Sequence, residues 1–362
     1  MAIDNSDTGK PKVSVIVVTY NQQGTIARTL DSILEQKTDF PVEIEIADDC
    51  STDSTGDICR RYVDNYPDKI RYTRNERNLG VRENYYRALL RCRAEYIADC
   101  AGDDFWCDAL KLQKQVEILD ANTDIGLVHT DWQYIDEATG AISPSDTSGE
   151  NIPFLKPVSE PGELLEAVFV NKMLIHWCTA LYRKDVFLKA EKEDPYPFWN
   201  SEITFEDFQL SVVYARDTRI AYIPDITMRY SIGKDTVTHT DNAAKECTFV
   251  YSLLKLKRHF AQKYALSEAF MRPIYIRYAR FLYSIALINN DLQQLREIDN
   301  YYRRNDLPRP LMCVVMSFLA PMPILGSALV AVKKKRHKAM KKKRAVAMFD
   351  FDDNKTLTVA TA

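Results

Sequence analysis

The chain has 362 residues, of which 46% are hydrophobic and 27% charged, so it is long enough for one large catalytic domain with an appendage and is not a disordered polymer. Its formal net charge is −3, yet residues 333–344 alone carry nine lysines and arginines, so the rest of the chain is acidic. An acidic body excludes a general nucleic-acid-binding surface, which needs clustered positive charge.

The eight cysteines contain no CxxC pair, which argues against a zinc ribbon or a thioredoxin-type site. The polar first residues lack the apolar run of a signal peptide. We therefore expect free thiols in a reducing cytoplasm.

Strand and helix patterns alternate through the first half of the chain. Apolar or alternating runs predict strands at residues 13–18, 42–46, 70–72, 96–101 and 126–130, and helical spacing lies between them. Repeated strand–helix units predict a parallel sheet covered on both faces, which binds ligands beyond the carboxyl ends of its strands.

The second half has a different character. Ser, Pro, Gly and Asp predict a loop at residues 136–162, mixed structure follows, and residues 243–304 are helical throughout. The predicted organisation is a polar tail, a catalytic domain, a helical appendage, an apolar segment with a basic flank, and a final tail, at residues 1–11, 12–235, 236–310, 311–344 and 345–362.

Two polar motifs follow the first two predicted strands. In the triplet Thr19-Tyr20-Asn21, Tyr20 could stack on a nucleobase. The triplet could equally form a turn in which Asn21 caps the next helix. Asp49, after Asp48, could accept a hydrogen bond from a base N–H or a ribose hydroxyl. Alternatively, it stabilises the N-terminus of the helix that follows.

Two acidic pairs lie further along. Asp103 and Asp104 follow a strand and a glycine, and their carboxylates suit a hard divalent cation that would offset the charge of a leaving diphosphate. Glu206 and Asp207 begin a helix, where one acid could serve as general base for an acceptor hydroxyl. Simple stabilisation of a helix N-terminus explains this second pair equally well.

Other signals are weak or absent. Lone histidines such as His176 and His239 are more often structural than catalytic, and the polar turn at residues 77–84 could face a diphosphate or merely reverse the chain. The sequence lacks a GxGxxG dinucleotide fingerprint, a GxxxxGK[ST] phosphate loop and an HExxH zinc site.

The motifs are individually weak, but their order is informative. The runs PKVSVIVVTYNQ, IADDCSTDST, NLGVRENYYRAL, AEYIADCAGDDFW and ITFEDFQL resemble, in this order, the family 2 inverting glycosyltransferases. The resemblance covers about residues 11–235. It implies an α/β protein with the GT-A, nucleotide-diphospho-sugar transferase fold, a Rossmann-like mixed sheet, followed here by a C-terminal helical appendage.

The resemblance also implies roles for the donor-site residues. Tyr20 and Asp49 correspond to contacts with the donor base. The turn that contains Asn78 and Arg82 lies along the donor, and Asp103 belongs to the same donor site.

For the chemistry, the resemblance implies that Asp104, with Asp103, binds Mn²⁺ or Mg²⁺, and that Asp207 is the catalytic base. Glu206 would contact the acceptor or support the site. The implied reaction is a single displacement with inversion at the anomeric carbon. A metal-binding histidine of many relatives is replaced here by Ile232, and His239 is the candidate substitute.

Residues 311–332 contain no charged side chain and would span roughly 33 Å as a helix, near bilayer thickness. The basic stretch at residues 333–344 would attract anionic lipid and mark a cytoplasmic flank. Because nucleotide sugars are cytoplasmic, we expect a shallow or re-entrant insertion bent at Pro321 and Pro323 rather than a single span. A buried hairpin with a solvated basic tail is the alternative.

The sequence thus predicts a metal-assisted, inverting glycosyltransferase at the inner face of the cytoplasmic membrane. Its expected partners are a nucleotide-sugar donor, UDP-linked by expectation, a saccharide or lipid-linked saccharide acceptor, and an anionic membrane surface, with no nucleic acid. The alternatives are a sugar nucleotidyltransferase and a non-enzymatic, membrane-tethered binding module.

Overall fold

The structure is a computed structural model that describes residues 10–145, 155–171, 175–232 and 243–322. The chain divides into two compact units, Met1–Thr236 and Val237–Ala362. Each unit is described by itself below.

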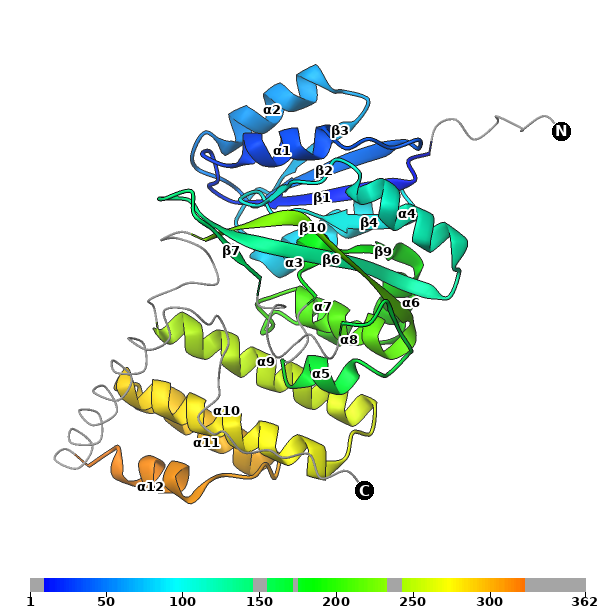
Figure 1. Cartoon of the computed structure of the whole chain (residues 1–362). Helices are drawn as coiled ribbons and strands as arrows, with labels where there is room; N and C mark the ends of the chain where they lie inside the picture. Colours follow the sequence, from blue (N-terminus) through cyan, green and yellow to red (C-terminus); the bar gives the residue numbers. More distant parts are fainter. Residues whose placement is uncertain (1–9, 146–154, 172–174, 233–242, 323–362) are drawn as a thin grey trace. The chain divides into compact units, whose positions relative to one another are not determined.

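The first unit is built on one mixed sheet (Figure 1). Its order is β3-β2-β1-β4-β9-β6-β10-β5, with β7 paired to β6 and β8 paired to β10. The strands are β1 (Val13–Thr19), β2 (Val42–Asp48), β3 (Ile70–Arg74), β4 (Tyr96–Asp99), β5 (Phe105–Trp106), β6 (Ile125–Asp136), β7 (Ile142–Pro144), β8 (Val158–Ser159), β9 (Leu181–Arg183) and β10 (Arg219–Ile232).

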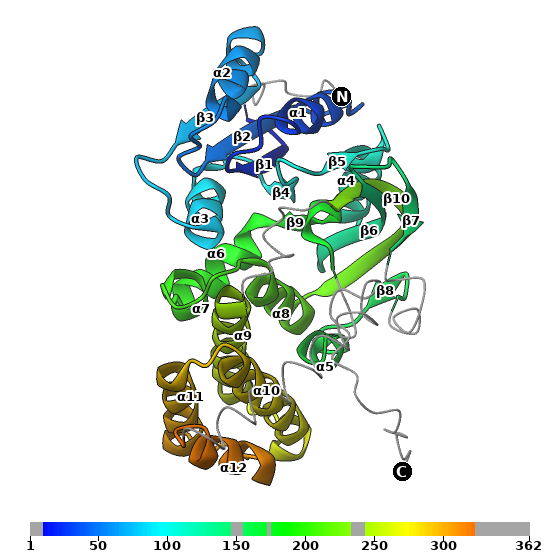
Figure 2. The ribbon, with the colours of Figure 1, turned by 90° about the vertical axis from the view of Figure 1, so that its left-hand side faces the viewer.

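Helices connect and cover these strands. They are α1 (Ile26–Leu34), α2 (Thr55–Asn65), α3 (Val81–Arg91), α4 (Lys111–Ala121), α5 (Leu165–Phe169), α6 (Lys184–Glu193), α7 (Tyr196–Trp199) and α8 (Asp207–Asp217), with a 3₁₀ helix at Trp177–Thr179. Helix α3 packs on β1 and β2, α2 packs on α1 and β3, and α4 packs on β6 and β9. Viewed from the side, α2 and α3 lie on opposite faces of the β1–β3 region (Figure 2).

The strand order reverses at β1, because the chain runs outward through β2 and β3 and then returns to place β4 on the other side of β1. These four strands are parallel. Right-handed crossovers therefore put the first helices on one face and α3 on the other. A reversal of this kind leaves a crevice beyond the carboxyl ends of β1 and β4, which is the usual ligand site of such sheets.

The second half of the sheet is mixed. Strand β9 runs antiparallel to β4 and β6, whereas β6 and β10 are parallel to each other. Residues 136–162, predicted as a loop, contain the short strands β7 and β8. The alternation of apolar and polar residues that indicates a strand covers too few residues there to distinguish an edge strand from a turn.

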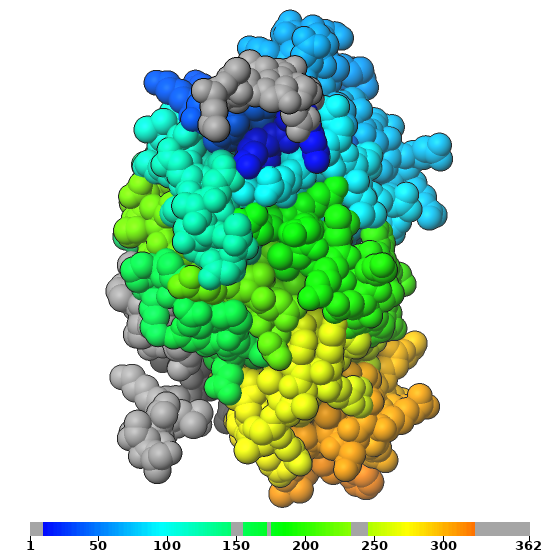
Figure 3. Space-filling model, turned by 90° about the vertical axis from the view of Figure 1, so that its right-hand side faces the viewer, coloured from blue at the N-terminus to red at the C-terminus, as the bar shows by residue number. Residues whose placement is uncertain are grey.

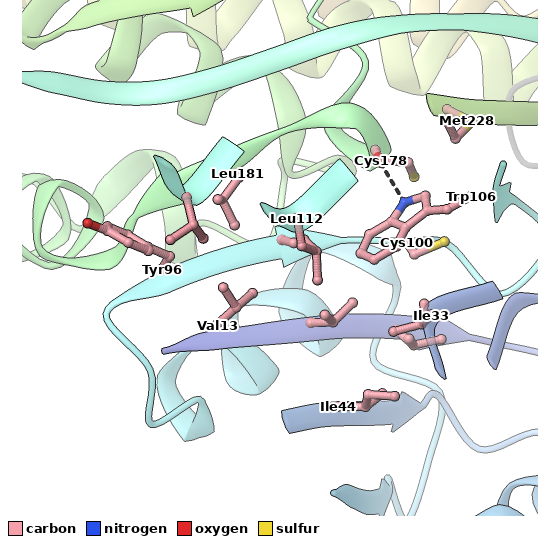
Figure 4. Packing of buried hydrophobic residues seen from close by; sticks show 14 of the residues in the cluster. Val13, Ile33, Ile44, Tyr96, Cys100, Trp106, Leu112, Cys178, Leu181 and Met228 are labelled. Carbon is pink, nitrogen blue, oxygen red and sulfur yellow. Dashed lines mark hydrogen bonds between the residues drawn. The ribbon is translucent and has the colours of Figure 1, made fainter. Parts of the chain in front are cut away.

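The core lies between the sheet and its helices. Val13, Val15 and Val17 are fully buried, because a parallel strand covered on both faces needs apolar side chains throughout. Towards the carboxyl ends of the strands, Trp106 donates from Nε1 to the carbonyl oxygen of Cys178 at 2.9 Å (Figure 4). This bond attaches the 3₁₀ helix to the loop after β4.

The second unit is helical within its described residues, as predicted for residues 243–304. It comprises α9 (Ala243–Lys263), α10 (Glu268–Ile288), α11 (Leu292–Arg304) and α12 (Leu311–Leu319). Helix α10 packs on α9, α11 and α12. Inside this unit Asp299 accepts hydrogen bonds from Tyr283 and Arg309 at 2.6 and 2.7 Å.

Among the described helices, none has both the length and the apolar character that crossing a bilayer requires. Residues 323–344, which complete the predicted membrane-associated segment and its basic flank, lie outside the described residues.

Candidate active site

The carboxyl ends of β1 and β2 are joined directly. The backbone N–H of Asp49 donates to the carbonyl of Thr19, and the N–H of Asn21 donates to Ser51 Oγ, both at 2.9 Å. Asn21 has a φ of 53° and Cys50 a φ of 67°. These left-handed residues turn the chain sharply out of both strands, so the two motifs lie side by side.

Asp49 is nearly buried, and its carboxylate is already engaged by the turn that precedes α3. Oδ1 accepts from the backbone N–H of Leu79 at 2.7 Å and from Asn75 Nδ2 at 2.9 Å, while Oδ2 accepts from the N–H of Gly80 at 2.8 Å. A carboxylate has about four acceptor positions. One position is therefore left on Oδ2, enough for a single further donor such as a base N–H.

The other predicted donor contacts have different surroundings. The Tyr20 side chain is 46% exposed at the end of β1, where a flat ligand could reach it. Asn78 is exposed and donates from Nδ2 to the carbonyl of Asp49. Arg82 is buried, and its guanidinium donates to the carbonyl oxygens of Phe198 and Ile203. Arg82 thus holds the segment before α8; its contact with a donor remains a prediction.

The loop after β4 passes close to the end of β1. Gly102 donates from its N–H to the carbonyl of Val18 at 3.0 Å and accepts from Thr25 Oγ1 at 2.8 Å. A Cβ atom on Gly102 would lie 2.9 Å from Thr19 Oγ1 and even closer to Gln22 Oε1. A larger residue would have to displace the Thr19 and Gln22 side chains, so glycine suits this close approach, which brings the following two aspartates to the end of β1.

Asp104 lies against the end of β10. It is 1% exposed, and Oδ1 accepts from the backbone N–H of Ser231 at 3.0 Å. Ser231 also donates from Oγ to the carbonyl of Asp103 at 2.6 Å. Burial and the neighbouring Asp103 carboxylate raise the pKa of Asp104 well above its usual range, and burial also raises the pKa of Asp103.

A divalent cation fits this donor set. Asp104 is buried and Asp103 is half-buried. Two neighbouring carboxyl groups that resist ionisation are neutralised by a nearby positive charge, and hard cations prefer such oxygens. Within the described part of the chain, no group of three or more His, Cys, Asp or Glu side chains is placed to hold a metal. Mg²⁺ is often held by one or two carboxylates and completed by substrate phosphates, so a pair is sufficient.

Glu206 and Asp207 stand at the start of α8, as predicted. The Asp207 side chain is exposed to solvent, and the protein atoms around it raise the pKa of its carboxyl. Burial, and secondarily the Asp207 charge, raise the pKa of Glu206 to about 8. The Glu206 carbonyl accepts from Tyr86 OH at 2.7 Å.

The segment with the 3₁₀ helix connects the two acidic pairs. The backbone N–H of Ala101 donates to Cys178 Sγ at 3.3 Å, whereas Trp177 donates from Nε1 to Ser211 Oγ at 3.0 Å. Ser211 in turn donates to the carbonyl of Asp207 at 2.9 Å. No local signal in the sequence marks Cys178 or Ser231 as part of the site, because both residues reach the acids only through long-range pairing.

The space-filling view of the opposite edge of the sheet, where the N-terminus enters, shows segments coloured for residues near 100 beside segments coloured for residues near 190, in agreement with the pairing of β4 with β9 (Figure 3). The two candidate histidines differ. His176 packs on Trp132 and Tyr230 with ring centroids 5.3 and 4.9 Å apart, and burial lowers its pKa to about 3, so it is neutral. His239, the predicted substitute metal ligand, lies outside the described residues.

Comparisons with known proteins agree on the class. Residues 14–189 match the family model described as glycosyl transferase family 2. An uncharacterized protein of Mycobacterium tuberculosis is 44% identical over 112 residues, which are 31% of this chain and 32% of that protein. The Escherichia coli UDP-Glc:alpha-D-GlcNAc-diphosphoundecaprenol beta-1,3-glucosyltransferase WfaP is 34% identical over 108 residues, 30% of this chain and 41% of that one. The matches thus span less than half of these relatives.

A solved structure extends the likeness to the fold of most of the chain. The mannosyltransferase PcManGT of Pyrobaculum calidifontis, in complex with GDP-Man and Mn²⁺, superimposes with a TM-score of 0.51 and 18% identity, over 93% of this chain and 88% of that one. The mixed sheet and its reversal at β1 therefore define a GT-A transferase fold, as predicted. Together with the family match, they show that residues 14–189 form a glycosyltransferase family 2 domain.

Proposed function

We propose that this protein transfers a sugar from a nucleotide-sugar donor to an acceptor hydroxyl by a single displacement that inverts the anomeric carbon. The observation that supports this most is the arrangement of the two acidic pairs. The loop with Asp103 and Asp104 and the start of α8 with Asp207 are joined through Ala101, Cys178 and Ser211 at one edge of the sheet.

The donor would lie beyond the ends of β1 and β2. Tyr20 offers an exposed aromatic face for a nucleobase, and Asp49 keeps one acceptor position for a base N–H. The relative whose name specifies a donor uses UDP-Glc, whereas the mannosyltransferase structure holds GDP-Man. We propose a UDP-linked donor, because the ring N–H of uracil is its only donor and matches the one remaining position, whereas guanine presents a ring N–H and an amino group.

Asp104 and Asp103 would hold Mn²⁺ or Mg²⁺ together with the donor diphosphate. When bound, the cation supplies charge neutralisation for the leaving nucleoside diphosphate. Arg28 lies beside the pair and donates to the carbonyl of Asp103 at 3.3 Å, while it is also paired with Glu137 at 2.7 Å. Arg28 therefore fixes the loop that carries the acids.

Asp207 would take the proton from the acceptor hydroxyl as that oxygen attacks the anomeric carbon. Burial raises the pKa of Asp207, which makes it a stronger proton acceptor, whereas its position in the first turn of α8 favours the anionic form. The proton passes from the acceptor oxygen to Asp207, and the glycosidic electron pair leaves with the diphosphate.

For the acceptor, we propose a saccharide carried on a lipid, presented at the inner face of the cytoplasmic membrane. Two features support this. The name of one relative specifies a GlcNAc-diphosphoundecaprenol acceptor. In addition, α12 exposes Leu311, Met312 and Phe318 by 79%, 56% and 70%, and the basic stretch at residues 333–344 follows it.

The test uses the full chain with a panel of nucleotide sugars, Mn²⁺ or Mg²⁺, and a lipid-linked saccharide. Asp207→Asn and Asp104→Asn should each lower transfer by about 10³-fold or more, as expected for loss of a base or of charge stabilisation. Asp57→Asn, on the exposed side of α2, is the matched control and should transfer like wild type. Wild-type turnover in either site variant would contradict the assignment.

A further inference from the structure

The short 3₁₀ helix at Trp177–Thr179 makes hydrogen bonds to both acidic segments of the site. It contacts the loop after β4, which carries Asp103 and Asp104, and it contacts α8, which begins with Asp207. Its three residues are buried, with exposed fractions of 9% or less. Neither the family resemblance nor the comparisons assign a role to this helix.

Cys178 holds the loop at two points, one on each side of Asp103 and Asp104. The backbone N–H of Ala101, before the acids, donates to Cys178 Sγ at 3.3 Å. Trp106, after the acids, donates from Nε1 to the carbonyl of Cys178 at 2.9 Å (Figure 4). Both ends of the loop are therefore attached to one residue of the 3₁₀ helix.

Trp177 holds the start of α8. Its Nε1 donates to Ser211 Oγ at 3.0 Å, and the same hydroxyl donates to the carbonyl of Asp207 at 2.9 Å. A hydroxyl that accepts one hydrogen bond and donates another connects its two neighbours. Trp177 is thus joined through Ser211 to the backbone of the proposed base.

Thr179 attaches the 3₁₀ helix to the core. Its carbonyl accepts from Gln115 Nε2 at 2.8 Å, and Gln115 Nε2 also donates to the carbonyl of Val128 in β6 at 3.0 Å. Gln115 is fully buried, and its Oε1 accepts from Lys111 Nζ at 2.9 Å. This third attachment, to α4 and β6, fixes the 3₁₀ helix independently of both acidic segments.

Packing alone restrains these segments weakly, because they meet around a cavity of about 50 Å³. The cavity is lined by Ala101 of the loop, Trp177 and Cys178 of the 3₁₀ helix, and Glu206 before α8. Side chains that border a cavity have fewer packing partners than those in a filled core. The hydrogen bonds of Trp177 and Cys178 are therefore important restraints on the separation of the loop from α8.

We propose that Trp177 and Cys178 are positioning residues, which hold the loop with Asp104 and the start of α8 with Asp207 at the separation that a single displacement requires. The roles of the two acids rest on the proposed function, whereas the attachments do not. In that reaction the leaving diphosphate beside Asp104 and the attacking hydroxyl beside Asp207 lie on opposite sides of the anomeric carbon. A misplacement of about 1 Å can lower the rate of such a step by about 10²-fold.

The first experiment is independent of activity and measures backbone hydrogen exchange of the full chain. Cys178→Ala removes the acceptor of the Ala101 N–H, so amides of residues 101–106 should exchange several-fold faster while the start of α8 exchanges as in wild type. Trp177→Phe removes the N–H that holds Ser211, so the start of α8 should exchange several-fold faster while the loop does not.

Further variants separate these local effects from a general loss of stability. Ser211→Ala breaks the bond to Trp177 from the α8 side, and Trp106→Phe removes the second bond to Cys178, so each stands in for a variant that fails to fold. Cys92→Ala removes a buried thiol at the end of α3 and is the matched control, with wild-type exchange in both segments. Faster exchange throughout the unit, or in neither segment, would overturn the proposal.

The second experiment measures transfer by the full chain with Mn²⁺ and a nucleotide sugar. Trp177→Phe should lower kcat by up to about 10²-fold and leave the KM for the nucleotide sugar unchanged, because the loop stays in place. Cys178→Ala should instead raise this KM and the Mn²⁺ concentration that gives half-maximal transfer, because the displaced loop carries Asp104. Cys178→Ser, which keeps an acceptor, should restore most of the loss.

A merely structural role would not divide the two effects in this way. Parallel changes of kcat and KM in Trp177→Phe and Cys178→Ala, or no rescue by Cys178→Ser, would overturn the positioning role. A wild-type protein that transfers no sugar from any nucleotide sugar would instead refute the proposed function and leave the exchange result standing.

Discussion

At the scale of single residues, the acids of the site have different roles that their sequence context does not reveal. The Asp49 carboxylate accepts three hydrogen bonds from other residues of the chain, whereas the Asp207 side chain is open to solvent. Asp99, which no motif marked, is more deeply buried than Asp207. Aspartates that look alike in the sequence therefore lie in different environments in the structure.

The first residue-scale prediction concerns Asp49. Asp49→Ala leaves the backbone N–H groups of Leu79 and Gly80 without their acceptor, so the free energy of unfolding should fall by about 1–3 kcal/mol. Urea unfolding followed by circular dichroism measures this. Asp57→Ala, which removes only an exposed ion pair with Arg60, should change it by less than about 1 kcal/mol. Equal effects of the two substitutions would show that the turn does not depend on Asp49.

The second prediction concerns pH. The folded-state pKa values of Asp99 and Glu206 are about 8, whereas an unfolded chain releases these protons near pH 4. The folded state is thus favoured by retained protons at low pH, and this contribution is lost as pH rises from about 4 to about 8. The urea midpoint of wild type should fall across this window, and that of Asp99→Asn should fall less. Parallel curves for the two proteins would contradict the raised pKa values.

At the scale of elements, the first four strands and the helices between them can be predicted from local patterns, because the spacing of apolar residues depends only on nearby positions in the chain. The pairing of β10 with β5, and of β9 with both β4 and β6, joins residues far apart in the chain. This pairing places Ser231 on Asp104 and Cys178 on the loop after β4. No local pattern predicts such contacts.

The element-scale prediction concerns the loop after β4. Gly102→Ala puts a Cβ 2.9 Å from Thr19 Oγ1 and closer still to Gln22 Oε1, so it must break the hydrogen bond between these two side chains or shift the loop. We expect a stability loss of about 1–3 kcal/mol, together with weaker metal-dependent donor binding, because the displaced loop carries Asp104. Thermal melting and calorimetric titration of nucleoside diphosphate with Mn²⁺ measure the two effects. Gly24→Ala, where a Cβ meets nothing within 4 Å, is the matched control.

At the scale of the whole molecule, the chain consists of a glycosyltransferase family 2 unit and a helical unit with an unusual surface. On α12, Cys313 and Met316 are buried while Leu311, Met312 and Phe318 face solvent. Exposed apolar side chains on a short helix, with a basic stretch further along the sequence, are the pattern expected of interfacial membrane binding.

The whole-molecule prediction follows from this surface. The full chain should co-sediment with vesicles that contain anionic lipid and much less with neutral vesicles, and added salt should weaken binding, since the basic stretch acts through screened charges. Leu311→Asp with Phe318→Asp should lower the bound fraction several-fold. Leu188→Asp, an exposed leucine on α6 in the first unit, should not. Equal binding of all three proteins would exclude α12 as the contact.

The sequence by itself determined the family, the order of the strands and helices in the first unit, and the residue types from which the site is assembled. These follow from local periodicity and from motifs that each lie within one strand end or helix start. Only the tertiary structure decided which side chains meet. The reversal of strand order at β1 and the return of β9 and β10 bring Ser231 and Cys178 to the acids, and they enclose Asp99 with Glu206 in one cavity. The physical reason is that burial and repulsion depend on neighbours in space, and those neighbours come from distant parts of the chain.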